Sequence, residues 1–459
     1  MASLAENHRA WRRILAFDFS QQEDNGGVQR RVVENMEIEF LNGMIAKEYR
    51  HLPELGLRPN MSGTEYRLLQ KDSAKLISNI VFSNHVIKIL KEMRYMVQHP
   101  EIEVSGRLQL EERNQQRVIT WRGVDNIKSQ FQIPTLLIDA TLPNLEILRV
   151  LHPEAEIVAD IRVPMPKCVK IRQVLKTPTS SYKLIKTEHP EKHLEEVRRY
   201  ILQRYFETGY GKTLVIIQKE VQEYLEGKLP DNISLEHFNA ISGLDKYKDV
   251  RLQILIGRTQ PGPEASEAQA ATLSGEMPKR HVPQNTRFKW YRRVIRSIRL
   301  RDGTGVAVLG DRHPDSFCES VRYQKTEDEL IQALGRGRGV NRADATPLSI
   351  DLLFDTVLPI TVDEVTYWDA PSLLYTIAFD DGVMLESPVD LVKVWPALWA
   401  NRKAASRCIK EGVPKIPGFE RVIYQLAGAK MNQRIGHFDL SKIPEPRLWL
   451  EGKLGRLAP

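Results

Sequence analysis

The sequence predicts an α/β fold in which a parallel β-sheet is covered by helices. Apolar runs at residues 213–217 and 253–256 have the length and composition of buried strands. Segments with helical periodicity lie on both sides of the first run. Strands and helices that alternate in this way are typical of a parallel sheet. We therefore predict a central α/β domain, with a mostly helical region before it and a small α+β appendage after it.

The composition indicates a folded protein with more than one hydrophobic core. The chain has 459 residues, of which 42% are hydrophobic and 27% charged, and this is enough for two or three domains. It contains no apolar run long enough for a membrane span and no secretion signal, so we expect a cytoplasmic protein. Its three widely spaced cysteines fit a reducing compartment. The net charge of +7 favours polyanions only mildly and does not decide the function.

Residues 1–130 are expected to form a helical region with a hairpin. Apolar residues recur at spacings of three and four in residues 33–44 and again in residues 77–90, which predicts two amphipathic helices. Two extended runs, at residues 104–110 and 117–121, enclose a polar segment and predict the hairpin.

Residues 131–186 are expected to end one domain and to connect it to the next. Residues 133–138 form an apolar run that ends in small and polar residues. A buried parallel strand ends in this way when it delivers a loop to a site at its carboxyl edge. Short β-rich runs follow, and three prolines lie among them: Pro153, Pro164 and Pro166. This pattern indicates a segment that connects one domain to the next.

Residues 187–360 are expected to form the central domain, and residues 361–459 the appendage. Helices are predicted at 194–206, 219–225 and 327–334, and a hairpin is predicted at 288–309. Residues 261–286 are rich in Pro, Ala, Ser, Gln and Glu, which predicts a solvated flexible loop. The appendage has four tryptophans that we expect in a core more often than at a binding surface: Trp368, Trp395, Trp399 and Trp449.

The string Gly211-Lys212-Thr213 resembles part of a phosphate-binding loop but lacks its context. The loop requires a glycine five residues before the Gly of Gly-Lys, and this chain has Phe206 there. The string also follows a predicted helix and opens a predicted strand, which is the reverse of the required order. We therefore expect a polar turn at this position.

The most specific string of the chain is the Gly/Arg cluster, residues 335–342, with Gln332 before it. The cluster contains no acid and holds three arginines within seven residues, Arg336, Arg338 and Arg342. An arginine guanidinium binds phosphoryl oxygens through two parallel hydrogen bonds and stays charged. The pattern therefore favours a phosphate clamp, and a solvated basic turn is the alternative.

Two further strings accompany the cluster in a defined order. Asp139-Ala140-Thr141-Leu142-Pro143 precedes it by about two hundred residues, and Gly243-Leu244-Asp245 lies between them. With these strings the chain resembles the superfamily 2 helicases, in particular those encoded on phages and integrated elements. The resemblance covers about residues 130–360.

The resemblance implies two RecA-like lobes that bind ATP with Mg²⁺ between them and act on DNA. Residues 131–186 then include the end of the first lobe, and residues 187–360 form the second. The coupling string of the family corresponds to Asp139, Ala140 and Thr141, and the positions beside the nucleotide correspond to Gly243, Asp245 and Gly335. An arginine finger is implied among Arg336, Arg338 and Arg342, with Gln332 opening the motif. The last arginine of the family pattern falls at Gly339, so the choice of finger stays open.

The phosphate-binding loop and the acidic string that holds magnesium have no counterpart in residues 1–132. We therefore expect a second motor lobe that is incomplete without a Walker-bearing first lobe, supplied by a missing segment or by a partner. The alternative is a non-enzymatic nucleic-acid-binding protein derived from a degenerate helicase.

A basic segment, residues 287–301, is a candidate for contact with single-stranded DNA. It has seven basic residues, three aromatic residues and no acid. Basic groups neutralise phosphates and aromatic rings stack on bases. The predicted contacts are Lys289, Arg292, Arg293 and Arg296. Equally, the apolar residues of this segment could anchor a hairpin while the arginines are only solvated.

Overall fold

The computed structural model describes residues 27–50, 52, 61–72, 74–113, 116–125, 127–128, 130, 132–240, 243, 245–281, 290–399, 401–428 and 433–458. The chain forms two compact units, each built from three segments. The first unit consists of Met1–Val158, Pro261–Arg292 and Arg312–Gln324. The second unit consists of Ala159–Gln260, Arg293–Asp311 and Lys325–Pro459. The predicted domain boundaries near residues 130, 186 and 360 stay predictions.

The first unit contains a small antiparallel sheet and a group of helices. The sheet has the strand order β1-β2-β3, with strands β1 (Gly27–Gln29), β2 (Val104–Arg113) and β3 (Gln116–Trp121). The predicted hairpin at 104–121 is therefore confirmed. A 3-10 turn, η2 (Arg30–Val32), leads to α2 (Ile38–Arg50), α3 (Gly63–Asp72) and α4 (Ala74–Gln98). One face of α4, which includes Val86, Leu90 and Met93, is buried in the hydrophobic core of these elements.

Residues 261–286 are not the loop that their composition predicts, because they contain the helix α9 (Pro263–Ser274). Pro263 stands at the first turn, where its missing N–H costs nothing, and Gly275 ends the helix with a φ of 86°. The alanines between them are the best helix formers, and the helix buries Ala270 and Ala271. The expectation of a flexible loop is wrong for this part, and residues 282–289 lie outside the described residues.

The second unit is organised around a six-stranded sheet in which all strands are parallel, so the predicted α/β class is confirmed at this level. The strand order is β12-β4-β10-β7-β5-β6. The strands are β4 (Val169–Leu175), β5 (Thr213–Ile217), β6 (Ile233–His237), β7 (Leu252–Ile256), β10 (Leu348–Leu353) and β12 (Glu364–Tyr367). The predicted strands β5 and β7 pair directly, with Val215 opposite Ile254.

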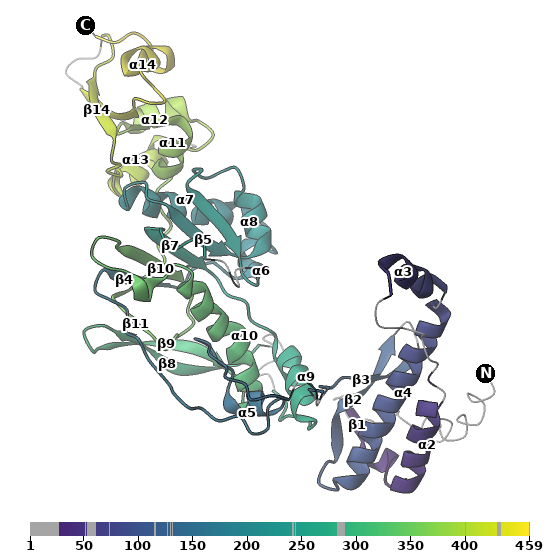
Figure 1. The fold of residues 1–459 in the computed structure, drawn as a ribbon. Helices are drawn as coiled ribbons and strands as arrows, with labels where there is room; N and C mark the ends of the chain where they lie inside the picture. Colours follow the sequence, from purple (N-terminus) through teal and green to yellow (C-terminus); the bar gives the residue numbers. More distant parts are fainter. Residues whose placement is uncertain are drawn as a thin grey trace. The chain divides into compact units, whose positions relative to one another are not determined.

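Helices cover both faces of this sheet (Figure 1). Val215 and Ile217 face α7 (Pro190–Glu207) and α8 (Lys219–Leu225), whereas Leu214 and Ile216 face the side of α10 (Ser316–Gly335). This alternation follows from the two-residue period of a strand. Both predicted helices beside β5 are confirmed, and α10 is longer than the predicted 327–334. A short helix, α6 (Ser181–Leu184), precedes α7.

A second, three-stranded sheet lies against α10. Its order is β11-β8-β9, with strands β8 (Arg292–Leu300), β9 (Gly305–Arg312) and β11 (Thr361–Val362). The predicted hairpin is confirmed in β8 and β9. Ile298 belongs to the same hydrophobic cluster as Leu330 and Leu334 of α10, so this sheet adds a layer to the core.

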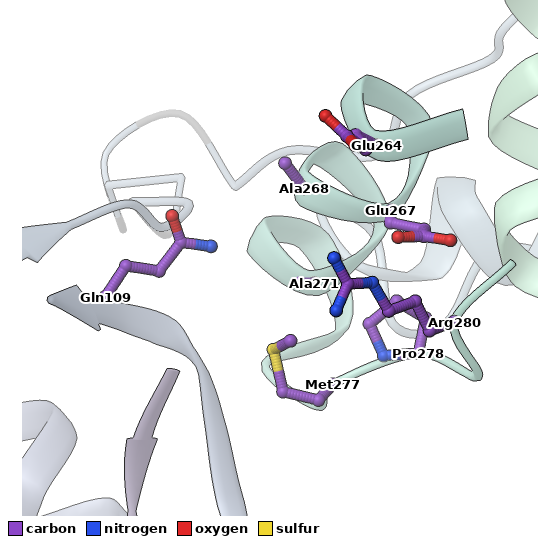
Figure 2. Close-up of a pocket in the computed structure, with 8 residues that line it drawn as sticks. All are labelled: Gln109, Glu264, Glu267, Ala268, Ala271, Met277, Pro278 and Arg280. Carbon is purple, nitrogen blue, oxygen red and sulfur yellow. The ribbon is translucent and has the colours of Figure 1, made fainter. Parts of the chain in front are cut away.

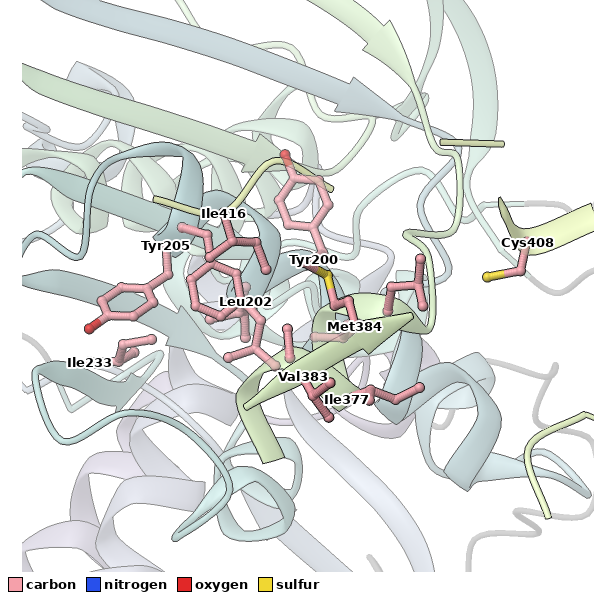
Figure 3. Packing of buried hydrophobic residues seen from close by; sticks show 14 of the residues in the cluster. Tyr200, Leu202, Tyr205, Ile233, Ile377, Val383, Met384, Cys408 and Ile416 are labelled. Atoms are coloured by element: carbon pink, nitrogen blue, oxygen red, sulfur yellow. The ribbon is translucent and has the colours of Figure 1, made fainter. Parts of the chain in front are cut away.

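The carboxyl-terminal elements form the predicted α+β arrangement. An antiparallel sheet of order β13-β15-β14 contains strands β13 (Val383–Leu385), β14 (Phe419–Tyr424) and β15 (Arg434–Asp439). The helices are α11 (Leu374–Asp381), α12 (Pro388–Val394), α13 (Arg402–Lys410) and α14 (Pro446–Leu454). Figure 3 shows their side chains meeting those of α7, as Ile377 and Met384 pack near Leu202. The four tryptophans all belong to or pack against this core, as predicted.

The strand predicted at residues 133–138 is absent. These residues form no regular secondary structure, make no strand pairing and are exposed. Their apolar pattern is that of a buried strand, but a strand needs a neighbouring strand for its backbone N–H and C=O groups. Among the described residues, no helix combines the length and hydrophobicity needed to span a membrane.

Candidate functional site

The Gly/Arg cluster lies at the amino edge of the six-stranded sheet. It follows the end of α10 and leads through the 3-10 turn η4 (Gly339–Asn341) into β10. A β-carbon on Gly337 would lie 2.5 Å from Gln253 Oε1 and 3.0 Å from a methyl group of Leu348. One on Gly339 would lie 2.9 Å from Met165 Sδ. At Gly337 the backbone packs directly on β7 and β10, which leaves no room for a side chain, whereas at Gly339 the flexible end of Met165 would have to move. Gly335 is different, since the space around it is open.

Arg342 holds the cluster in this shape. Its side chain is buried, and its Nε and Nη2 donate hydrogen bonds of 2.9 and 2.7 Å to the carbonyl of Gly337. Burial lowers the pKa of the guanidinium, and the nearby carboxylate of Asp249 opposes this effect. The side chain thus closes a loop of its own backbone over the sheet edge.

The side chain of Arg338 is exposed and contacts Asp245, which belongs to a different string of the sequence. Its Nε and Nη2 lie 2.7 and 2.6 Å from Asp245 Oδ1. The two side chains are 48% and 63% exposed, so solvent and ligands reach the pair. Arg338 also has a left-handed backbone, with φ of 51°, which is uncommon for a residue with a side chain. The structure therefore brings together predicted site residues that are 93 positions apart.

The remaining cluster residues frame this pair. Gln332 is half-buried on the last turn of α10, and Arg336 is half-buried directly after the helix, where its N–H donates to the carbonyl of Ala333. Gly243 has a φ of 75° with open space around it. Residues 241, 242 and 244 lie outside the described residues.

Other cations lie on the same edge of the sheet. The exposed Lys212 directly precedes β5, and its carbonyl accepts a hydrogen bond from the N–H of the exposed Arg251. The turn at Lys212 follows α7 and opens β5, so the prediction of a polar turn is confirmed. The amino edge is thus rich in positive charge, which favours a polyanionic ligand.

The chemistry of these side chains fits phosphoryl oxygens and does not fit magnesium. Guanidinium groups are donors for phosphate oxygens, whereas Mg²⁺ requires carboxylate or other oxygen ligands. At this edge the carboxylate of Asp245 is already paired with Arg338. Within the described ranges, no group of three or more His, Cys, Asp or Glu side chains is arranged to hold a metal.

The coupling string belongs to the other compact unit. Asp139 Oδ1 accepts hydrogen bonds of 2.8 Å from the Thr141 N–H and 3.1 Å from the Thr141 hydroxyl. This local turn buries Thr141 and leaves Asp139 and Ala140 exposed. Asp139, Ala140 and Thr141 lie in the first unit, and the Gly/Arg cluster lies in the second.

The basic segment is less free than its sequence indicates, because acids from other elements face it. Arg296 lies 3.4 Å from the buried carboxylate of Glu327 on α10. Arg293 lies 3.7 Å from Asp311 at the end of β9, which Arg258 also contacts at 2.7 Å. Arg292 is exposed, and Lys289 lies outside the described residues. Sequence reasoning missed these acids because they come from neighbouring elements of the fold.

A pocket in the first unit has a volume of about 190 Å³. Figure 2 shows its lining residues, which are Gln109, Glu264, Glu267, Ala268, Ala271, Met277, Pro278 and Arg280. The carboxylate of Glu267 already accepts a hydrogen bond of 2.5 Å from the His281 N–H and lies 3.1 Å from His313 Nε2. With one acid engaged inside the fold and with mixed charges, the pocket has no phosphate-binding character.

Comparison with known proteins adds no relative. No family model, curated protein or solved structure matches the chain. The functional proposal therefore depends on the strings of the sequence and on the geometry of the amino edge.

Proposed function

We propose that this chain supplies the second, RecA-like lobe of an ATP-dependent helicase or translocase of superfamily 2 that acts on DNA. The observation that carries the proposal is the pair of Arg338 and Asp245 at the amino edge of the sheet. Two strings of the helicase resemblance, far apart in sequence, meet there in one exposed and positively charged site.

Within this proposal Arg338 is the arginine finger. Its guanidinium is exposed and is bound only loosely to one carboxylate oxygen, since an exposed ion pair stabilises a protein by about 0–1 kcal/mol. A phosphoryl group can therefore take the place of Asp245 at low cost. Arg342 acts through the loop: its bonds to Gly337 hold the turn from which Arg338 projects.

The lobe is incomplete by itself. Hydrolysis requires a phosphate-binding loop and carboxylates that hold magnesium, in addition to the positive charge of a finger. We assign both to a Walker-bearing first lobe, carried on the same polypeptide or on another. ATP bound there supplies the phosphoryl group, and the arginines of this chain stabilise the negative charge that develops on it.

The second candidate function is nucleic-acid binding without catalysis. It is favoured by the exposed Arg292 and Arg299 on β8, which lie in a segment free of acids. In this case Arg338 and Asp245 would have no role in turnover. The two functions differ in what happens when a first lobe is added.

The test is to fuse a Walker-bearing first lobe to this chain and to measure ATP hydrolysis. Arg338→Ala should lower turnover by roughly a hundredfold or more, since a finger contributes about 10³–10⁵ in rate. Arg421→Ala, an exposed arginine on β14, is the matched control and should keep the parental rate. Arg342→Ala should lower both the rate and the melting temperature. Parental rates in Arg336→Ala and Arg338→Ala together would contradict the proposal and favour the second candidate.

A further inference from the structure

Helix α13 (Figure 1), which lies outside the residues of the helicase resemblance, has a strongly basic side. Lys403, Arg407 and Lys410 are exposed and follow one another at spacings of four and three residues, so they form a row along the helix. Arg402 is also exposed, and it lies beside this row together with the half-buried Ser406. The four cations are named the α13 basic face below.

The opposite side of α13 is anchored in the core of the second unit. Ala405 and Cys408 are buried there, in the hydrophobic cluster that also contains Trp399. Asn401 caps the first turn, because its side chain accepts a hydrogen bond of 3.0 Å from the Ala404 N–H. The helix is therefore held through its small residues, and the α13 basic face is left to solvent.

No acid compensates the charge of the α13 basic face. Residues 391–419 contain six cations and a single acid, Glu411. Among the residues that the structure describes, none forms an ion pair or a side-chain hydrogen bond with the four cations. Like charges three and four residues apart destabilise a helix, and cations in the first turn oppose its dipole. A surface that conflicts with these local rules indicates a functional role, which here is contact with an anionic partner.

The composition of the α13 basic face favours nucleic-acid phosphates over a membrane or a protein. A helix that binds a membrane inserts apolar side chains into the lipid, but the apolar side chains of α13 already pack in the core. The centre of a protein interface is depleted in lysine and uses aromatic or apolar anchors, and the four cations include none. They also offer no aromatic ring that could stack on an unpaired base.

We infer that the α13 basic face binds the phosphate backbone of double-stranded DNA. Cations without stacking side chains fit the duplex best, because its two strands give the higher density of negative charge. The helix is nine residues long, which corresponds to roughly 13 Å, or the axial rise of about four nucleotides of one strand. Contacts with phosphates carry no sequence information, so duplexes of different sequence should bind equally. This binding requires neither ATP nor a first lobe and does not depend on the proposed function.

The test is fluorescence anisotropy with the full chain and a labelled duplex of random sequence, without ATP, at salt concentrations between roughly 50 and 200 mM. Replacing Lys403, Arg407 and Lys410 together by alanine should weaken binding about tenfold or more at the lower salt concentration. The slope of log affinity against log salt should become shallower by about two to three, since each lost phosphate contact accounts for about 0.9. The matched control removes the same charge and should keep the parental slope. It replaces three exposed cations on other elements by alanine: Lys192, Arg421 and Lys453.

Two further measurements separate the charge of the face from the fold of the helix. A variant that combines Lys403→Arg, Arg407→Lys and Lys410→Arg keeps every charge and should bind as the parent does. The melting temperature of the alanine variant should not fall, because alanine favours a helix and the repulsion is removed. Four outcomes would overturn the inference: equal slopes in the alanine variant and the control, lost affinity in the charge-preserving variant, a larger loss for single-stranded than for double-stranded DNA, or lost binding to phosphatidylserine vesicles with unchanged duplex binding.

Discussion

Replacing Gly337 by alanine tests the packing of the Gly/Arg cluster on the sheet. The new methyl group would lie 2.5 Å from Gln253 Oε1 and 3.0 Å from Leu348. Gln253 is fully buried and cannot turn away without loss, because its Nε2 donates a hydrogen bond of 2.7 Å to the carbonyl of Ala333. Overpacking of this kind costs about 1–3 kcal/mol, and loss of the hydrogen bond adds about 1 kcal/mol. We expect Gly337→Ala to lower the free energy of unfolding by about 2–4 kcal/mol.

Gly335→Ala is the matched control, because the same methyl group meets open space there. A glycine-to-alanine change near a helix end is worth at most about 1 kcal/mol, and alanine favours the helix. Urea unfolding followed by circular dichroism measures both variants. Equal unfolding midpoints for Gly337→Ala and Gly335→Ala would refute the close packing of the cluster.

Three further predictions concern charge, thiols and pH. Arg296→Ala should lower the free energy of unfolding by about 1–3 kcal/mol, because Glu327 loses an ion pair while it stays buried. Arg292→Ala should leave the free energy of unfolding unchanged and should reduce the salt slope of single-strand binding by about one. Equal free energies of unfolding for the two variants would contradict this prediction. Burial raises the pKa of two of the three thiols, so a thiol reagent should modify one cysteine of the native chain quickly, and Cys168→Ser should remove that phase while Cys318 and Cys408 stay slow. Burial raises the pKa of four tyrosines from 10.0 to about 12: Tyr210, Tyr224, Tyr291 and Tyr375. Between pH 10 and 12 the folded chain therefore keeps protons that the unfolded chain loses, so the free energy of unfolding should fall as the pH rises through this range. Ultraviolet absorbance should show that these tyrosines ionise later in the folded chain than in the unfolded chain.

Local patterns predicted the elements whose partners are close in sequence. The strand β5, its flanking helices α7 and α8, and both hairpins appear where periodicity and turn residues place them. Helix α9 was missed although its signals are present: Pro263 at the first turn, a run of alanines, and Gly275 after the last turn. The low content of large apolar residues concealed it, because α9 packs through alanines.

Features that depend on distant parts of the chain could not be predicted. The pairing of Arg338 with Asp245 joins residues on different elements, and the acids that face Arg293 and Arg296 come from β9 and α10. The strand predicted at 133–138 has the right composition, but composition cannot supply the neighbouring strand that pairing requires.

The central claim is that the chain supplies one lobe of a two-lobe motor, and ATP hydrolysis by the purified chain alone tests it most directly. The Gly/Arg cluster offers positive charge without a group that holds magnesium, so turnover should equal that of a mock preparation, with or without single-stranded DNA. Fusion to a Walker-bearing lobe should then produce turnover that depends on Arg338. Robust, DNA-stimulated hydrolysis by the chain alone would contradict the account.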